Sequence, residues 1–185
     1  SGNGYDWVVY HAKDSAGLYL NSNGNNNDSS SNNIWFNGAA PTSSVFTTGT
    51  DGRIGNAVDY IAYCFAEKKG FSKFGSYKGD GRSSGPFVYT GFKPAWFMIK
   101  KSSGSNGWYM YDTKRPGYNT TQANSDSLLA DTSDTEFNSN IDIVSNGFKI
   151  RTNGVGENSD GASFIFMAFA ENPIVGSNKV PAVAR

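Results

Sequence analysis

Two apolar runs stand out along the chain because the sequence around them is rich in Asn, Ser and Gly. Residues 60–67 read YIAYCFAE and residues 164–171 read FIFMAFAE, so each has seven apolar residues closed by a glutamate. A run of this length fits a buried strand or part of a buried helix. Its aromatic and isoleucine content and its turn-rich flanks favour a strand. We therefore expect the first apolar run (residues 60–67) and the second apolar run (residues 164–171) to form strands buried on both faces.

Shorter apolar segments extend this pattern over the rest of the chain. Trp7 and Val9 alternate with Val8 and Tyr10, which is the two-residue period of a strand. Gly-rich and Asn-rich turns separate such segments, and no segment has a sustained helical period, so helix is expected in a turn or two at most. Further strands are expected at residues 7–11, 34–36, 45–46, 71–77, 86–89, 95–100, 108–112, 141–144 and 148–151. This pattern predicts an all-β fold, an antiparallel β-sandwich.

The chain repeats itself at a spacing of about 100 residues, which suits a small β-sandwich. Trp108 follows Trp7 by 101 residues, and Glu171 follows Glu67 by 104. Both copies run from a W-x-x-Y strand through a leucine pair to an apolar run. The sequence predicts a first, incomplete repeat at residues 1–70, a second at 71–175 and a tail at 176–185.

The first repeat has no counterpart of the strands expected at residues 71–100. Either it is the end of a longer polypeptide, which we favour, or both copies share one larger sandwich. A half-sandwich would expose unpaired strand edges and an apolar face. The first repeat is therefore expected to need a partner, which could be upstream sequence, the second repeat or another chain.

Charge and composition narrow the function classes. Lys plus Arg and Asp plus Glu both number 16, so the net charge of zero argues against nucleic-acid partners and anionic membranes. No apolar stretch approaches the length of about 20 residues that crosses a bilayer. The single Cys64 excludes an internal disulfide and is expected to pack as a small hydrophobe. With one His and one Cys, no soft-metal site and no cofactor are predicted.

Catalysis is not expected. A glycosidase needs two carboxyl groups about 5 to 10 Å apart across a groove. Of the four glutamates, Glu67 and Glu171 end equivalent strands, so we interpret them as structural residues that bind backbone or a lysine. His11 and Asp112 occupy equivalent positions with different chemistry, which argues against a shared catalytic role.

Sugar binding is the sharper alternative, because aromatic faces stack on sugar rings while Asn and Asp donate and accept hydrogen bonds. The candidates for ligand binding are Trp35, Tyr19 and Tyr118, with the polar loop at residues 21–33. Trp7, Trp96 and Trp108 are expected in the core, because they lie in predicted strands. Acidic and amide clusters at residues 25–28 and at Asp131 and Asp134 have oxygen ligands but no diagnostic calcium spacing, so no metal site is predicted.

Several motifs resemble one family over nearly the whole chain. They are the first apolar run, GFSKFGSY at residues 70–77, GPFVYTGFKPAW at 85–96, SNGFKIR at 145–151 and FMAFAENP at 166–173. Together they resemble the C-terminal repeats of tail-fibre-like virion structural proteins of bacteriophages, many of them marine. The resemblance implies jelly-roll or concanavalin-like sandwiches on the virion surface and no known catalysis.

The function expected from this resemblance is a structural and interaction module of a phage appendage. Its partners would be further copies of the chain, with a trimer favoured, or a neighbouring virion protein. An alternative is a carbohydrate-binding adhesin at the fibre tip that recognises host surface glycan. A polysaccharide depolymerase is the third possibility.

Overall fold

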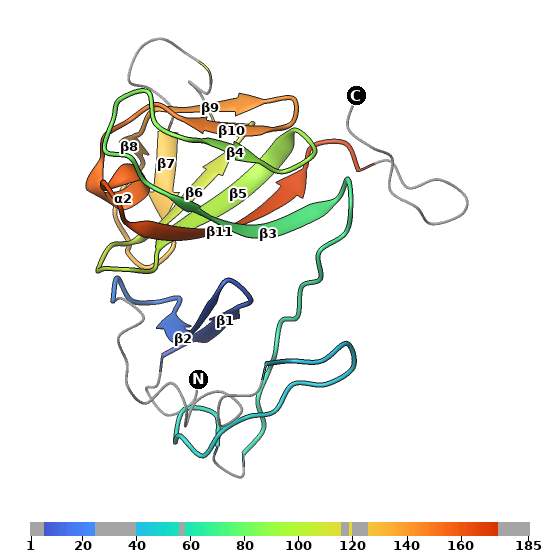
Figure 1. Ribbon diagram of the computed structural model, residues 1–185. Coiled ribbons are helices and arrows are strands. Elements are labelled where there is room, and N and C mark those ends of the chain that lie inside the picture. Colours follow the sequence, from blue (N-terminus) through green and yellow to red (C-terminus); the bar gives the residue numbers. More distant parts are fainter. Residues whose placement is uncertain (1–5, 25–39, 56–57, 116–118, 120–125, 174–185) are drawn as a thin grey trace.

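The strand at residues 94–101 shows why this chain folds in layers. Phe97 and Ile99 point to one side of their sheet and Met98 points to the other, and all three are buried. A strand that is apolar on both faces needs a covering layer on each side. The computed structural model, which describes residues 6–24, 40–55, 58–115, 119 and 126–173, provides both layers (Figure 1).

The central layer is a six-stranded antiparallel sheet with the order β3-β11-β5-β6-β7-β8. Its strands are β3 (Ser72–Lys78), β11 (Ser163–Ala170), β5 (Pro94–Lys101), β6 (Trp108–Asp112), β7 (Asp126–Leu129) and β8 (Phe137–Asn138). The second apolar run forms β11, which pairs with β3 on one side and β5 on the other. The prediction that this run is a buried strand is confirmed.

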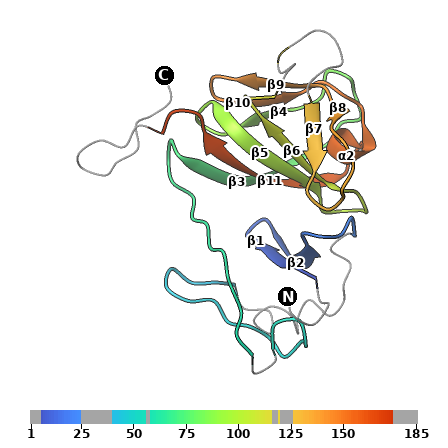
Figure 2. The ribbon, with the colours of Figure 1, turned by 180° about the vertical axis from the view of Figure 1, so that it is seen from behind.

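A three-stranded sheet covers one face of the central sheet, as Figure 2 also shows from behind. Its order is β4-β10-β9, from β4 (Phe87–Tyr89), β10 (Gly147–Ile150) and β9 (Ile141–Val144). Phe148 of β10 stacks on Phe97 of β5 with ring centroids 4.3 Å apart, and both rings are fully buried. Full burial of a phenylalanine contributes about 1.5–3 kcal/mol. The expected all-β antiparallel sandwich is therefore the fold, and the hairpin predicted at residues 141–151 is present.

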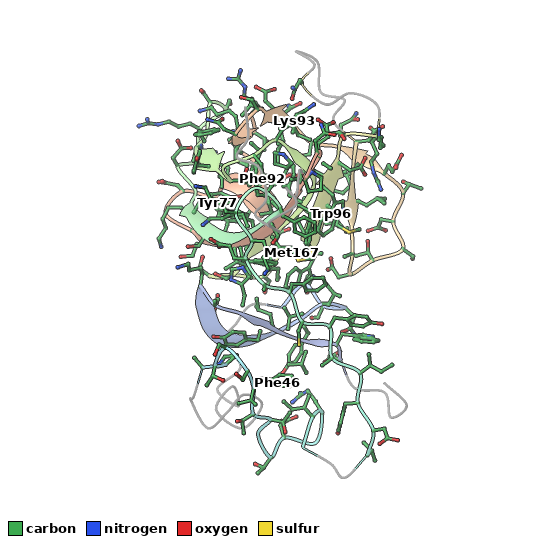
Figure 3. All side chains as sticks on the ribbon, turned by 90° about the vertical axis from the view of Figure 1, so that its right-hand side faces the viewer. Phe46, Tyr77, Phe92, Lys93, Trp96 and Met167 are labelled. Carbon is green, nitrogen blue, oxygen red and sulfur yellow. The ribbon has the colours of Figure 1, made fainter. Side chains whose placement is uncertain are left out.

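A hairpin of β1 (Val8–His11) and β2 (Asp14–Tyr19) covers the opposite face of the central sheet. Leu18 is buried there with Met98, Trp108 and Ile165. Figure 3 shows Met167 on the side of the sandwich that faces this hairpin, and Phe46 beyond the hairpin. The hairpin therefore closes the second apolar face of the central sheet.

The first apolar run was expected to be a buried strand, and this prediction is wrong. Residues 60–67 form no strand and are exposed along their whole length. Figure 1 shows them in an extended segment that leads up to the start of β3. The strand expected at residues 45–46 is also absent, and Val45 and Phe46 are exposed. The physical reason is the same in both places: no neighbouring strand pairs with these segments within the described part of the chain.

The structure tests some of the remaining expectations, and others fall on residues that it does not describe. The strands expected at residues 71–100 pair with β6, β10 and β11, not with the first repeat. Among the described residues, helix is limited to one turn, α2 (Val155–Asn158), and none there is long or apolar enough to span a bilayer. The strand at residues 34–36, most of the polar loop and the tail lie outside the described residues. The division into two repeats stays a prediction.

Candidate functional site

A groove lies where an edge of each sheet meets the end of the β1–β2 hairpin. β3 is the last strand of the central sheet, and β4 is the last strand of the three-stranded sheet. The groove has a volume of about 380 Å³ and takes side chains from both edges, the hairpin turn and the end of the first apolar run. The residues that give it its chemistry are Lys13, Glu67, Lys73, Ser76, Phe87 and Tyr89.

The wall of the groove formed by β4 is aromatic. Phe87 and Tyr89 are 47% and 64% exposed, whereas Val88 between them is buried in the core. The alternation of a strand thus places both rings on the outer face. Across the groove, the Lys73 ammonium lies 2.7 Å from the Glu67 carboxylate. Two accessible aromatic rings beside ammonium and carboxylate groups can bind a ring-shaped polar ligand by stacking and hydrogen bonding.

Gly75 shapes the floor of this groove. A Cβ atom at this position would lie 2.6 Å from the ring of Phe166, which is closer than side chains approach. The glycine therefore lets the Phe166 ring approach the backbone of β3 closely, and this ring also packs edge-on against Phe148.

Four exposed large apolar side chains lie within the eight residues of the first apolar run. Ile61 and Tyr63 are 74% and 71% exposed, and Phe65 is exposed as well. Within this run, Tyr63 lies 6.4 Å from Trp7 and Phe65 lies 5.9 Å from Phe169, both measured between ring centroids. An exposed contiguous apolar surface marks an interaction site.

Of the predicted ligand-binding residues, the structure describes Tyr19. Its ring lies under the guanidinium of Arg53, 5.1 Å from the ring centroid, so a cation already occupies one of its faces. Trp35 and Tyr118 lie outside the described residues. Tyr19 does not line the groove, so the structure does not join it to Phe87 and Tyr89.

The expectations for the tryptophans and the cysteine hold only in part. Trp108 is buried and Trp96 packs against the same cluster, as expected. Trp7 is 46% exposed, so its expected place in the core is wrong. Cys64 is exposed rather than packed as a hydrophobe, because it lies in the first apolar run, which has no strand beside it.

All four glutamates have a polar partner. Glu67 pairs with Lys73, and Glu171 pairs with Lys93 at 2.8 Å, which confirms that these two equivalent residues hold lysines. Glu136 pairs with Arg115 at 2.8 Å. The fourth, Glu157, is buried inside the sandwich.

Glu157 is the centre of a buried polar cluster at the end of the core. Its carboxylate accepts hydrogen bonds from the hydroxyls of Ser139 at 2.6 Å and Tyr111 at 3.0 Å, and Tyr77 donates to its backbone oxygen at 2.7 Å. Burial raises the pKa of Glu157, and the two hydrogen bonds to its carboxylate oppose this shift. Burial also raises the pKa of Tyr111. These groups anchor the helical turn α2 to the core.

Two basic groups are buried where the hairpin meets the central sheet. His11 accepts from the backbone N–H of Lys13 through Nδ1, so its Nε2–H donates to the Phe166 oxygen at 3.1 Å. Burial lowers the pKa of His11. Lys100 donates to the carbonyl oxygens of Asn23 and Asn106, and burial lowers its pKa to about 8.

Comparison with protein families assigns residues 1–173 to the family described as Domain of unknown function (DUF7483). The chain belongs to the DUF7483 family. The matched residues include the hairpin, the first apolar run and the sandwich. Comparisons with curated proteins and with solved structures found no match for this DUF7483 chain.

Sequence reasoning missed the groove of the DUF7483 chain and the buried Glu157. The groove had a signal, because Phe87 and Tyr89 flank a valine in a predicted strand and must share one face. Nothing in the sequence indicates that Glu157 is buried. Its burial depends on the packing of α2, which brings the carboxylate to Tyr111 and Ser139. Within the described residues, no group of three His, Cys, Asp or Glu could hold a metal ion.

Proposed function

We propose that this protein is a structural and interaction module of an extended assembly, which associates with its neighbour through the first apolar run. The observation that carries this proposal is the exposure of that run beside a sandwich whose core is closed. The resemblance to phage tail-fibre repeats makes a virion appendage the proposed setting. Further copies of the chain or a neighbouring virion protein are the proposed partners.

The apolar surface that a partner would cover includes the side chains of Ile61, Tyr63 and Phe65. Each exposes most of its side chain, whereas Ile165 and Met167, the counterparts of Ile61 and Tyr63 in the second apolar run, lie in or beside the core. Covering three such side chains would contribute about 1.5–3 kcal/mol each. A segment with this sequence is a hazard if it stays uncovered, because extended apolar strands aggregate. A partner in the assembly removes that hazard.

Cys64 offers a direct test, because it is exposed in the middle of the run. Its reaction with a maleimide would be followed in the isolated chain and in particles that carry the protein. We expect labelling to be at least about tenfold slower in the particles, where a partner shields the thiol. The matched control is Cys64→Ala with Ser44→Cys, which places the thiol on a different exposed segment. Equal rates for Cys64 in both preparations would refute the proposal.

Glycan binding at the β3–β4 groove is the second candidate function. Its support is the pair of exposed rings, Phe87 and Tyr89, next to the charged side chains of Lys13, Glu67 and Lys73. The proposed sugar contacts are therefore the rings of β4 rather than Tyr19, whose ring faces Arg53.

A glycan array read with Phe87→Ala and Tyr89→Ala variants tests this candidate. Each substitution should weaken binding about tenfold, since a stacked aromatic contact contributes about 0.5–1.5 kcal/mol beyond its area. Val155→Ala is the control, because Val155 is an exposed apolar residue that does not line the groove. Binding that survives the loss of both rings would exclude the groove.

A further inference from the structure

The β1–β2 hairpin repeats the β6–β7 hairpin pair by pair. Val9 is opposite Leu18 in the first, and Met110 is opposite Leu128 in the second. The backbone hydrogen bond from Leu20 to the Trp7 oxygen has its counterpart from Ala130 to the Trp108 oxygen. The correspondence therefore holds in the backbone and is not limited to sequence.

A side-chain contact repeats as well. The N–H of Trp7 donates to Asn21 Oδ1 at 2.8 Å, and the N–H of Trp108 donates to Asp131 Oδ1 at the same distance. β1 is thus the structural equivalent of β6. By its sequence, the first apolar run is the equivalent of β11.

In the sandwich, one strand, β5, lies between β6 and β11. β5 pairs with β6 on one side and with β11 on the other, antiparallel to both. Lys100 is flanked by Trp108 and Ile165, and Met98 is flanked by Met110 and Met167.

Within the described residues, the first copy has both neighbours of such a strand but not the strand itself. Among the described residues, β1 pairs with β2 alone, and residues 60–67 form no strand pair. Trp7 and Tyr63 nevertheless lie together, 6.4 Å apart between ring centroids. Their equivalents in the sandwich, Trp108 and Met167, belong to one buried cluster across β5.

We infer that β1 and the first apolar run form an acceptor site for one β-strand of a partner protein. This inference rests on the proposed function and names the kind of partner. The partner strand is about eight residues long, apolar on both faces like β5, and antiparallel to β1. The register places one of its residues between Trp7 and Ile61, and the residue two positions away between Val9 and Tyr63.

The strand is not β5 of this chain or of a second copy. β5 is paired on both sides, and its Phe97 and Ile99 are fully buried. Releasing β5 would open the sandwich that supplied it. A partner with an unpaired apolar strand loses nothing of that kind.

A peptide with the β5 sequence, KPAWFMIKKS from residues 93–102, serves as the probe. Amide hydrogen exchange of the intact chain would be followed with and without this peptide. We expect the peptide to slow exchange at least about tenfold in both β1 and residues 60–67. A peptide with Met98→Pro should have no effect, because proline interrupts the pairing of a central strand.

Proline in the acceptor gives the matched variant. Tyr63→Pro should abolish the protection without changing the thermal unfolding of the free chain, because Tyr63 forms no strand pair there. Val58→Pro, just outside the run, should bind the peptide as the parent chain does.

Three results would overturn the inference. They are no protection at saturating peptide, protection confined to the edge of β3, and self-association that Tyr63→Pro abolishes, since a second copy would then cover the run. If Cys64 is shielded in particles but the peptide does not bind, the proposed function survives and the strand site fails. If Cys64 is not shielded, the proposed function fails whatever the peptide does.

Discussion

The indole Nε1–H of Trp108 donates to the backbone oxygen of Tyr19 at 2.8 Å. This hydrogen bond joins the hairpin to the sandwich at a point where apolar contacts surround it. Val9 and Met110 are equivalent residues of the two hairpins, and both pack against the apolar cluster that contains Trp108. The equivalent residues Leu20 and Ala130 do so as well. The two copies of the hairpin therefore meet through the same face.

Replacing Trp108 with phenylalanine tests this attachment. Trp108→Phe keeps an aromatic ring in the cluster but removes the indole N–H, so the Tyr19 oxygen loses this hydrogen bond. We expect a loss of about 1 kcal/mol in the free energy of unfolding and faster amide exchange in β2. Denaturant unfolding and hydrogen exchange measure the two effects. Unchanged exchange in β2 would show that the apolar contacts alone hold the hairpin.

The buried Glu157 gives a matched pair of variants. Because burial raises its pKa, the folded state favours the protonated carboxyl, and the stability that this provides is lost as the pH rises from about 4.5 through the folded pKa. Glu157→Gln keeps an acceptor for Tyr111 and Ser139 without the charge, so at pH 7 it should be as stable as the parent or more stable. Glu157→Ala removes the acceptor and should cost about 1–3 kcal/mol. Thermal unfolding measures both variants, and equal losses would mean that the charge itself is needed.

His11 should make the protein sensitive to mild acid. Burial lowers its pKa below the ordinary 6.5, so on acidification the unfolded chain takes up a proton before the folded one does. The free energy of unfolding should therefore fall as the pH drops below about 6.5, until the folded pKa is reached. Unfolding titrations of the parent chain and of His11→Gln isolate this effect from that of Glu157. Parallel pH profiles would contradict the burial of a neutral imidazole.

Lys100 should produce a rise in stability at alkaline pH. Its pKa of about 8 in the folded chain lies below the ordinary 10.5, so the folded state releases the proton first. The parent chain should gain about 1.5 kcal/mol between pH 8 and about pH 9.5 relative to Lys100→Met. The buried tyrosines oppose this gain only above about pH 10, where the unfolded chain ionises. A constant difference between the two proteins across this range would show that Lys100 stays charged.

The sequence predicted the strands of the sandwich because each has its partners nearby in the same fold. The second apolar run becomes β11 because β3 and β5 lie on either side of it. The first apolar run has the same pattern, yet only Lys68, just after it, forms a bridge, with Ser72. An apolar pattern shows that a segment can form a buried strand. It does not show whether a neighbouring strand is present to pair with it.

The candidate site was harder to predict for a different reason. Phe87 and Tyr89 could be placed on one face of a strand by alternation. Their meeting with Lys13 and Glu67 depends on how the hairpin docks on the sandwich, and no local signal encodes that docking. The predicted contacts at Trp35 and Tyr118 lie outside the described residues, so they stay predictions.

Hydrogen exchange of the two apolar runs in one monomeric preparation tests directly whether the first apolar run is unpaired while the second lies in the central sheet. The runs have matching sequences, so their intrinsic exchange rates provide an internal control. We predict strong protection for residues 163–170, which form β11, and exchange close to that of an unfolded peptide for residues 60–67. Comparable protection of both runs in the monomer would contradict this prediction, because the first apolar run would then already be paired within its own chain.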